Sequence, residues 1–155
     1  MRTFLANVRR SLSEFFFVEE TPYGMACMRI MLPLVMFSMV LPRWPYTREL
    51  YSSDGATAPL AVGYGYFSLL PEFSGEVAVA LHSMLVLALC CVLVGYKTRW
   101  ALVLSLVIYP YLSLLDAIST MTKYTVITTH LLLLLSCSNC GAIWSVDAWL
   151  RGGND

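Results

Sequence analysis

The sequence has little charge: 13% of its 155 residues are Asp, Glu, Lys or Arg, and the ten basic side chains cancel the ten acidic ones. Because basic residues are not in excess, the composition does not indicate the positively charged surface that binds nucleic acid, and no nucleic-acid partner is expected. In place of charge, 58% of the residues are hydrophobic and the mean hydropathy is +0.68. A soluble domain of this size would not tolerate that balance, and the composition therefore predicts an integral membrane protein surrounded by membrane lipids.

Cysteine and histidine are also sparse, with five and two residues. Cys137 and Cys140 form a C-x-x-C, a spacing that occurs in redox proteins. No second cysteine pair in the predicted outer loop could relay electrons, and the pair is expected at the reducing, cytoplasmic end. We therefore interpret it as two small residues at a helix terminus. No metal site is expected, because two further zinc ligands are not close in the sequence.

Four hydrophobic runs have about the length that a bilayer requires. They are Met25–Leu41, Val77–Val94, Trp100–Leu115 and Tyr124–Leu135, the last of which we extend to Cys140. Backbone polar groups in lipid need partners within their own segment, so these runs predict helices. The ends are marked by Pro42, by Gly95 in a left-handed turn, and by Asp116. The predicted fold is an all-α integral membrane protein with four transmembrane helices.

Two further segments complete the predicted organisation. Residues 1–24 carry apolar side chains near helical spacing with arginines between them, which predicts an amphipathic helix on the membrane surface; a helix that docks on a soluble partner is the alternative. Arg43–Glu76 is rich in aromatic residues and glycine, which predicts an outer loop at the headgroup level, with turns and a short helix. The transmembrane domain is expected over residues 25–150, followed by a short polar tail, 151–155.

Basic residues in short loops indicate which side of the membrane is cytoplasmic. Both termini and the loop with Lys97 and Arg99 carry more of them than the opposite side. With four spans these three segments share one side. Both termini are therefore predicted to be cytoplasmic.

Ionisable residues in or beside the spans are the best pointers to function, because each is costly to place in hydrocarbon. Arg29 is expected to extend its head toward the cytoplasmic interface. His82, Asp116, Lys123 and His130 are expected to converge in the outer half of the bundle, under the aromatic loop. They are the candidates for a catalytic or ligand-binding site. The alternative is structural: hydrogen bonds between helices and an ion pair at the interface.

The order of several short segments resembles the horizontally transferred transmembrane (HTTM) domain family, which is related to vitamin K-dependent gamma-carboxylase. The segments are Phe15-Phe16-Phe17, Met28-Arg29-Ile30, Tyr51-Ser52-Ser53-Asp54-Gly55, Gly95-Tyr96-Lys97-Thr98-Arg99 and Trp144-Ser145-Val146-Asp147. The resemblance covers roughly residues 15–150. It implies a helical membrane domain and is consistent with a bacterial inner membrane.

The resemblance does not extend to the carboxylase reaction. The carboxylase uses a lysine just after the third helix to deprotonate a vitamin K hydroquinone, but here Ala117 follows Asp116 and Lys123 lies several residues further on. The carboxylase also has further spans and a large luminal domain for its protein substrate. A complete carboxylase is therefore not expected.

Two functions are consistent with the sequence. In the first, the chain is a non-catalytic accessory or scaffold subunit that packs against other integral membrane subunits, with a crevice for lipid or quinone. In the second, it is a minimal carboxylase-like or quinone-linked membrane enzyme that uses His82, Asp116, Lys123 and His130. The first needs fewer unproven parts. No cofactor follows from the sequence beyond that lipid or quinone.

Overall fold

The computed structural model describes residues 23–55, 71–116, 123–150 and 152, and every regular element within them is a helix. The elements are α2 (Tyr23–Val40), the 3-10 helix η1 (Leu41–Tyr46), α3 (Thr47–Tyr51), α5 (Gly75–Val94), α6 (Thr98–Leu115), α8 (Lys123–Cys137) and α9 (Val146–Leu150). The predicted all-helical fold is confirmed for these residues. The predicted surface helix falls almost wholly, and the middle of the aromatic loop entirely, outside the described residues.

Three of the helices are long and apolar enough to cross a membrane: the helical segment that starts at Tyr23, α5 and α6. The fourth predicted span corresponds to α8, which is apolar but has only 15 residues. At a rise of 1.5 Å per residue, α8 is about 22 Å long and falls short of a hydrocarbon core of about 30 Å. By length and composition, three helices in the described part of the chain can therefore span a membrane, and the fourth span remains a prediction.

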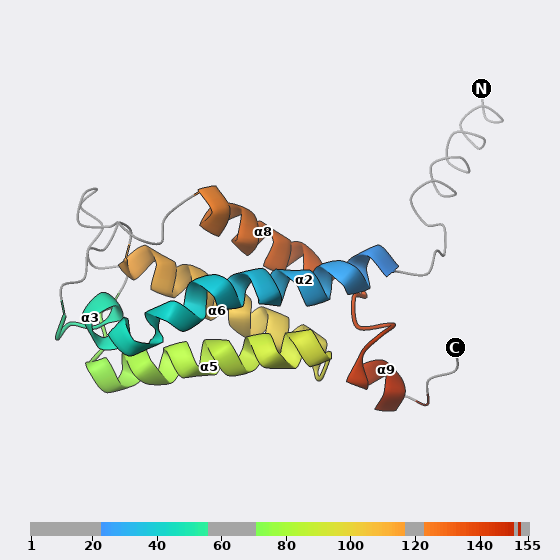
Figure 1. The fold of residues 1–155 in the computed structure, drawn as a ribbon, viewed down its shortest axis with the longest axis horizontal. Coiled ribbons are helices and arrows are strands. Elements are labelled where there is room, and N and C mark those ends of the chain that lie inside the picture. Colours follow the sequence, from blue (N-terminus) through green and yellow to red (C-terminus); the bar gives the residue numbers. More distant parts are fainter. Residues whose placement is uncertain (1–22, 56–70, 117–122, 151, 153–155) are drawn as a thin grey trace, which may run out of the picture.

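The helices form an open bundle in which consecutive elements lie side by side (Figure 1). α6 packs against both α5 and α8, and α2 packs against α5. α2 and α8 make few contacts with each other, so the ring of helices is loosely closed on that side. η1 and α3 cover one end of the bundle, and α9 lies at the other end.

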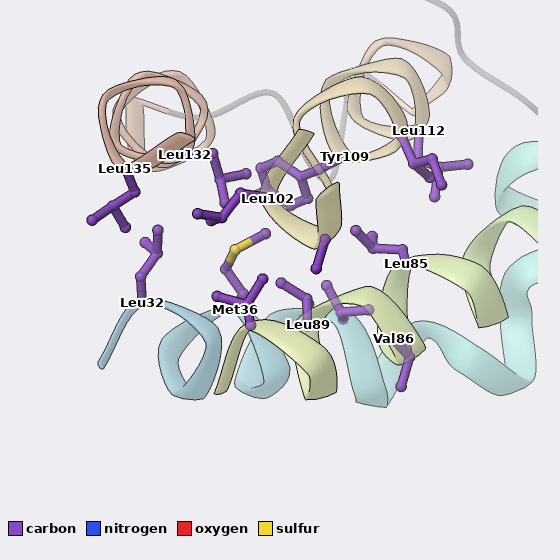
Figure 2. Packing of buried hydrophobic residues seen from close by; sticks show 14 of the residues in the cluster. Leu32, Met36, Leu85, Val86, Leu89, Leu102, Tyr109, Leu112, Leu132 and Leu135 are labelled. Carbon is purple, nitrogen blue, oxygen red and sulfur yellow. The ribbon is translucent and has the colours of Figure 1, made fainter. Parts of the chain in front are cut away.

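The core is apolar, and it lies between helices that have apolar residues on their outer faces as well. Figure 2 shows Met36, Leu89 and Leu102 pointing toward one another from α2, α5 and α6. Leu132 of α8 closes the cluster and is completely buried. Because the outer faces are equally hydrophobic, the helices lack the polar side of a soluble amphipathic helix. The pattern agrees with a bundle whose exterior meets lipid.

The sequence signals for helix ends agree with the structure. α5 ends at Val94, and Gly95 follows in the left-handed conformation with φ +79°. Its amide donates to the carbonyls of Cys91 and Val92, which have no partner within the helix. α6 ends at Leu115 and is followed by Asp116, as predicted; it also contains Pro110 near its end. α2 ends at Val40, just before Pro42, and the chain continues directly as η1.

Candidate functional site

A cavity of about 160 Å³ lies inside the bundle, near the end that η1 and α3 cover. Its lining is mostly apolar, but it includes hydroxyl groups, one imidazole and one guanidinium group. The lining residues are Met39, Val40, Arg43, Tyr51, His82, Leu85, Tyr109, Leu112, Ser113, Tyr124 and Thr125. A mostly apolar cavity with a few convergent polar groups is the usual form of a small-molecule site. We call it the His82 cavity.

His82 lines this cavity, and its side chain is 2% exposed. Its Nε2 lies 3.2 Å from the carbonyl oxygen of Val40. That carbonyl is available because α2 ends at Val40. A carbonyl can only accept, so Nε2 must carry the proton and, in the neutral ring, Nδ1 is an acceptor. Nδ1 is buried and has no hydrogen-bond partner among the described residues.

Two aromatic rings fix the orientation of the His82 imidazole. The Tyr51 ring stacks on it, with centroids 5.9 Å apart and an interplanar angle of 23°. The Trp44 ring meets it edge-on at 5.8 Å and 70°. Both rings come from the segment that follows α2, so this segment holds the histidine in place from two directions. The unpartnered Nδ1 therefore belongs to a ring with little freedom to turn toward another partner.

The segment Tyr51 to Gly55 is tied to the start of α5, which carries His82. The Ser53 amide donates to the Phe73 carbonyl at 3.0 Å, and the Gly75 amide donates to the Asp54 carboxylate at 3.1 Å. The second bond satisfies one of the free amides at the N-terminus of α5. These bonds position Tyr51 against His82.

The four residues predicted to form one site are only partly brought together. His82 lines the cavity, but Asp116, Lys123 and His130 do not. Asp116 is buried at the end of α6 and interacts electrostatically with Tyr51. Lys123 is exposed at the start of α8. His130 is exposed, and its Nδ1 lies 2.7 Å from the Val126 carbonyl of its own helix.

Arg43, Tyr51 and Tyr109 also line the cavity, and sequence reasoning did not select them as site residues. Arg43 and Tyr51 belong to the aromatic segment that was expected to roof the site, which was the only signal for them. Tyr109 is one of several aromatic residues in the third hydrophobic run. Nothing in the sequence marks it as facing inward.

An apolar groove adjoins the His82 cavity on the side where α2 and α8 diverge. Its volume is about 270 Å³. It is lined almost entirely by apolar side chains of these two helices: Met28, Met31, Leu32, Val35, Met39, Tyr124, Ile127, Thr128, Leu131 and Leu135. Met39 and Tyr124 line both spaces. The groove and the cavity therefore meet at these two side chains.

At the opposite end of the bundle, Arg29 is completely buried. Its Nη1 donates to the carbonyls of Cys140 and Ile143 at 3.4 and 3.5 Å, and its Nη2 donates to the carbonyl of Trp144. The Arg29 head extends toward this end of the bundle, but it is buried under the loop that follows α8 and does not reach solvent. Its guanidinium instead organises the loop that follows α8, because its fork of donors can reach several carbonyls at once.

Asp147 ties the same loop to the turn between α5 and α6. Its carboxylate accepts from the amides of Lys97 and Thr98, both at 2.8 Å, and from the Thr98 hydroxyl at 2.9 Å. Its own amide donates to the Gly95 carbonyl at 2.9 Å. Three segments that are far apart in the sequence, around Arg29, Gly95 and Asp147, thus meet at one place. We call this arrangement the Arg29 lock.

Cys137 and Cys140 are both free thiols in the structure. Cys137 is the last residue of α8 and is exposed, whereas Cys140 is buried beyond the helix end. The Cys140 thiol lies 3.5 Å from the Leu135 carbonyl, as a weak donor would. The pair therefore serves the turn after α8 in this structure.

A family model described as "HTTM domain" matches residues 17–154. The match covers both the His82 cavity and the Arg29 lock. The chain matches no curated protein and no solved structure.

Proposed function

Since the chain belongs to the HTTM domain family and has helices that can span a membrane, we propose that it is a non-catalytic accessory subunit of a larger membrane complex. We further propose that its His82 cavity holds the polar head of a lipid or a quinone. We also propose that both termini lie in the cytoplasm, because basic residues gather near them, and that the membrane is a bacterial inner membrane, which fits the family.

The observation that carries the ligand proposal is the buried Nδ1 of His82, which has no hydrogen-bond partner in the part of the chain that the structure describes. A buried acceptor without a hydrogen bond lowers the stability of the fold by about 1–3 kcal/mol. The fold nevertheless keeps this acceptor in its interior. A ligand hydroxyl would satisfy it. Arg43 in the same wall can donate to a ligand carbonyl or phosphate oxygen. The cavity therefore suits a small head that offers both a donor and an acceptor.

The adjoining groove supports an amphipathic rather than a fully polar ligand. Its lining is apolar, and it meets the cavity at Met39 and Tyr124. When the polar head of the ligand lies in the cavity, its acyl or isoprenoid chain extends along the groove between α2 and α8. Methionine side chains from α2 would adapt to chains of different shape.

The accessory role is supported by the small number of predicted catalytic residues that line the His82 cavity. Catalysis by proton transfer needs an acid or base positioned on the reacting group. Of the four candidate residues, His82 lines the cavity, whereas Asp116, Lys123 and His130 do not. One observation favours the enzyme alternative: the His82 Nδ1 is a buried base beside a cavity. If it is used, His82 acts alone as the proton acceptor.

Ligand binding can be followed through Trp44, whose ring centroid lies 5.8 Å from that of His82. We expect decylubiquinone or dioleoylglycerol to change the Trp44 emission of the purified protein in a saturable way. His82→Phe keeps the aromatic packing but removes the acceptor, so affinity should fall about tenfold, the value of one hydrogen bond. His130→Phe is the matched control, because His130 is exposed outside the cavity.

If the change in tryptophan emission comes from the His82 cavity, Trp44→Phe must abolish it. Equal affinities in the wild type and His82→Phe would contradict the proposed site. Turnover of the quinone that is lost in His82→Phe would replace the accessory role with the enzyme alternative.

A further inference from the structure

A second polar cavity, of about 360 Å³, lies at the Arg29 end of the bundle, away from the His82 cavity. It is formed where the N-terminus of α6 faces the turn after α8. Its polar lining includes Lys97, Thr98, Arg99, Ser138 and Asn139. The proposed function makes no use of it.

The electrostatics of this cavity favour an anion. Lys97 and Arg99 are both exposed and contribute two positive charges to the lining. Asp147 also lines it, but its carboxylate accepts from the amides of Lys97 and Thr98 and its charge interacts with that of Arg29. Two lining cations against one carboxylate leave the cavity with a net positive charge.

The surroundings place this cavity at the level of lipid headgroups. Trp100, which also lines it, is 77% exposed on the first turn of α6, a helix that can span the membrane. Exposed tryptophans at the ends of spanning helices lie at the membrane interface. Basic pockets between transmembrane helices at that level bind anionic headgroups.

We propose that this cavity binds the phosphate of an anionic phospholipid. Lys97 and Arg99 neutralise the phosphate, while Ser138 and Asn139 supply hydrogen bonds to the phosphate or to the glycerol hydroxyls. Trp100 packs along the upper part of the lipid chain. The α6 amides of Lys97 and Thr98 are engaged by Asp147, so the side chains carry the recognition. The bound lipid would hold α6 and the turn after α8 together.

The test uses the full chain in nanodiscs of dioleoylphosphatidylcholine with dioleoylphosphatidylglycerol, followed by native mass spectrometry of the released protein. We expect the wild type to retain one phosphatidylglycerol molecule. Lys97→Gln/Arg99→Gln should reduce this retention about tenfold or more, since each basic residue contributes on the order of 1 kcal/mol near an anionic surface. Arg48→Gln/Lys123→Gln is the matched control, because it removes two exposed charges from the opposite end of the bundle.

Equal losses in the two double variants would overturn the proposal in favour of general attraction to the membrane. Retention of phosphatidylcholine and phosphatidylglycerol in equal amounts by the wild type would also overturn it. Displacement of the lipid by inorganic phosphate would assign the site to a free anion. Lys97→Arg/Arg99→Lys preserves both charges and must retain the lipid, which separates loss of binding from loss of folding.

Discussion

Replacement of Arg29 by alanine is expected to lower the free energy of unfolding by about 3 kcal/mol. The substitution removes the donors that satisfy the carbonyls of Cys140, Ile143 and Trp144. It also leaves a void, because Arg29 is the largest of the completely buried side chains. The loss can be measured by SDS titration of the purified protein in mixed micelles, followed by circular dichroism.

Two variants separate the hydrogen bonds of Arg29 from its volume. Arg29→Met fills most of the space without donors and should remain strongly destabilised. Arg29→Lys keeps a charge but not the planar fork, so it should recover part of the loss. An Arg29→Met protein as stable as the wild type would contradict the Arg29 lock, because packing alone would then explain the position.

Replacement of Gly95 by alanine is expected to cost a similar amount, about 3 kcal/mol. A Cβ on Gly95 would lie 2.4 Å from the Ser145 Cβ and 2.7 Å from the Arg29 Nη1. The backbone at this residue is also left-handed, with φ +79°, which disfavours any side chain. Both effects act on the same lock that Arg29 organises.

Gly24→Ala is the matched control, because a Cβ there meets no atom within 4 Å and Gly24 lies in α2. It should be neutral or stabilise the protein by up to about 1 kcal/mol, as alanine is the better helix former. The same SDS titration compares the two variants. If Gly95→Ala is as stable as Gly24→Ala, the turn after α5 does not pack against Ser145 as described.

The hydrophobic runs were sufficient to predict the helices, because lipid removes most alternatives to helical backbone. Gly95 and Asp116 also marked helix ends correctly, whereas at Pro42 the α-helix gives way to a 3-10 helix and the chain stays helical. The length of α8 was less predictable. We extended the fourth helix to Cys140, but α8 stops at Cys137, and the following residues form the turn that Arg29 binds.

The candidate site was harder to predict than the fold, because a sequence gives the depth of a residue in the membrane but not its direction around the helix. His82, Asp116, Lys123 and His130 were grouped by depth alone. In a helix with apolar residues on all sides, no pattern distinguishes an inward position from an outward one. The sequence thus did not distinguish His82, which is buried, from His130, which is exposed.

The role of Arg29 depended on contacts that no local pattern encodes. Its partners are carbonyls more than 110 residues away in the sequence. A lone arginine in a hydrophobic run is ordinarily expected to reach for the interface. The short segments that carry the family resemblance were nevertheless informative, because those around Arg29, Gly95 and Asp147 meet in the Arg29 lock.

The most direct test of the central claim is gentle purification of the full chain from its native membrane into nanodiscs, followed by mass spectrometry of everything that stays bound. We expect stoichiometric larger membrane proteins together with a lipid or quinone that His82→Phe fails to retain. A lone chain that retains no such molecule would contradict both the accessory role and the His82 cavity as a binding site.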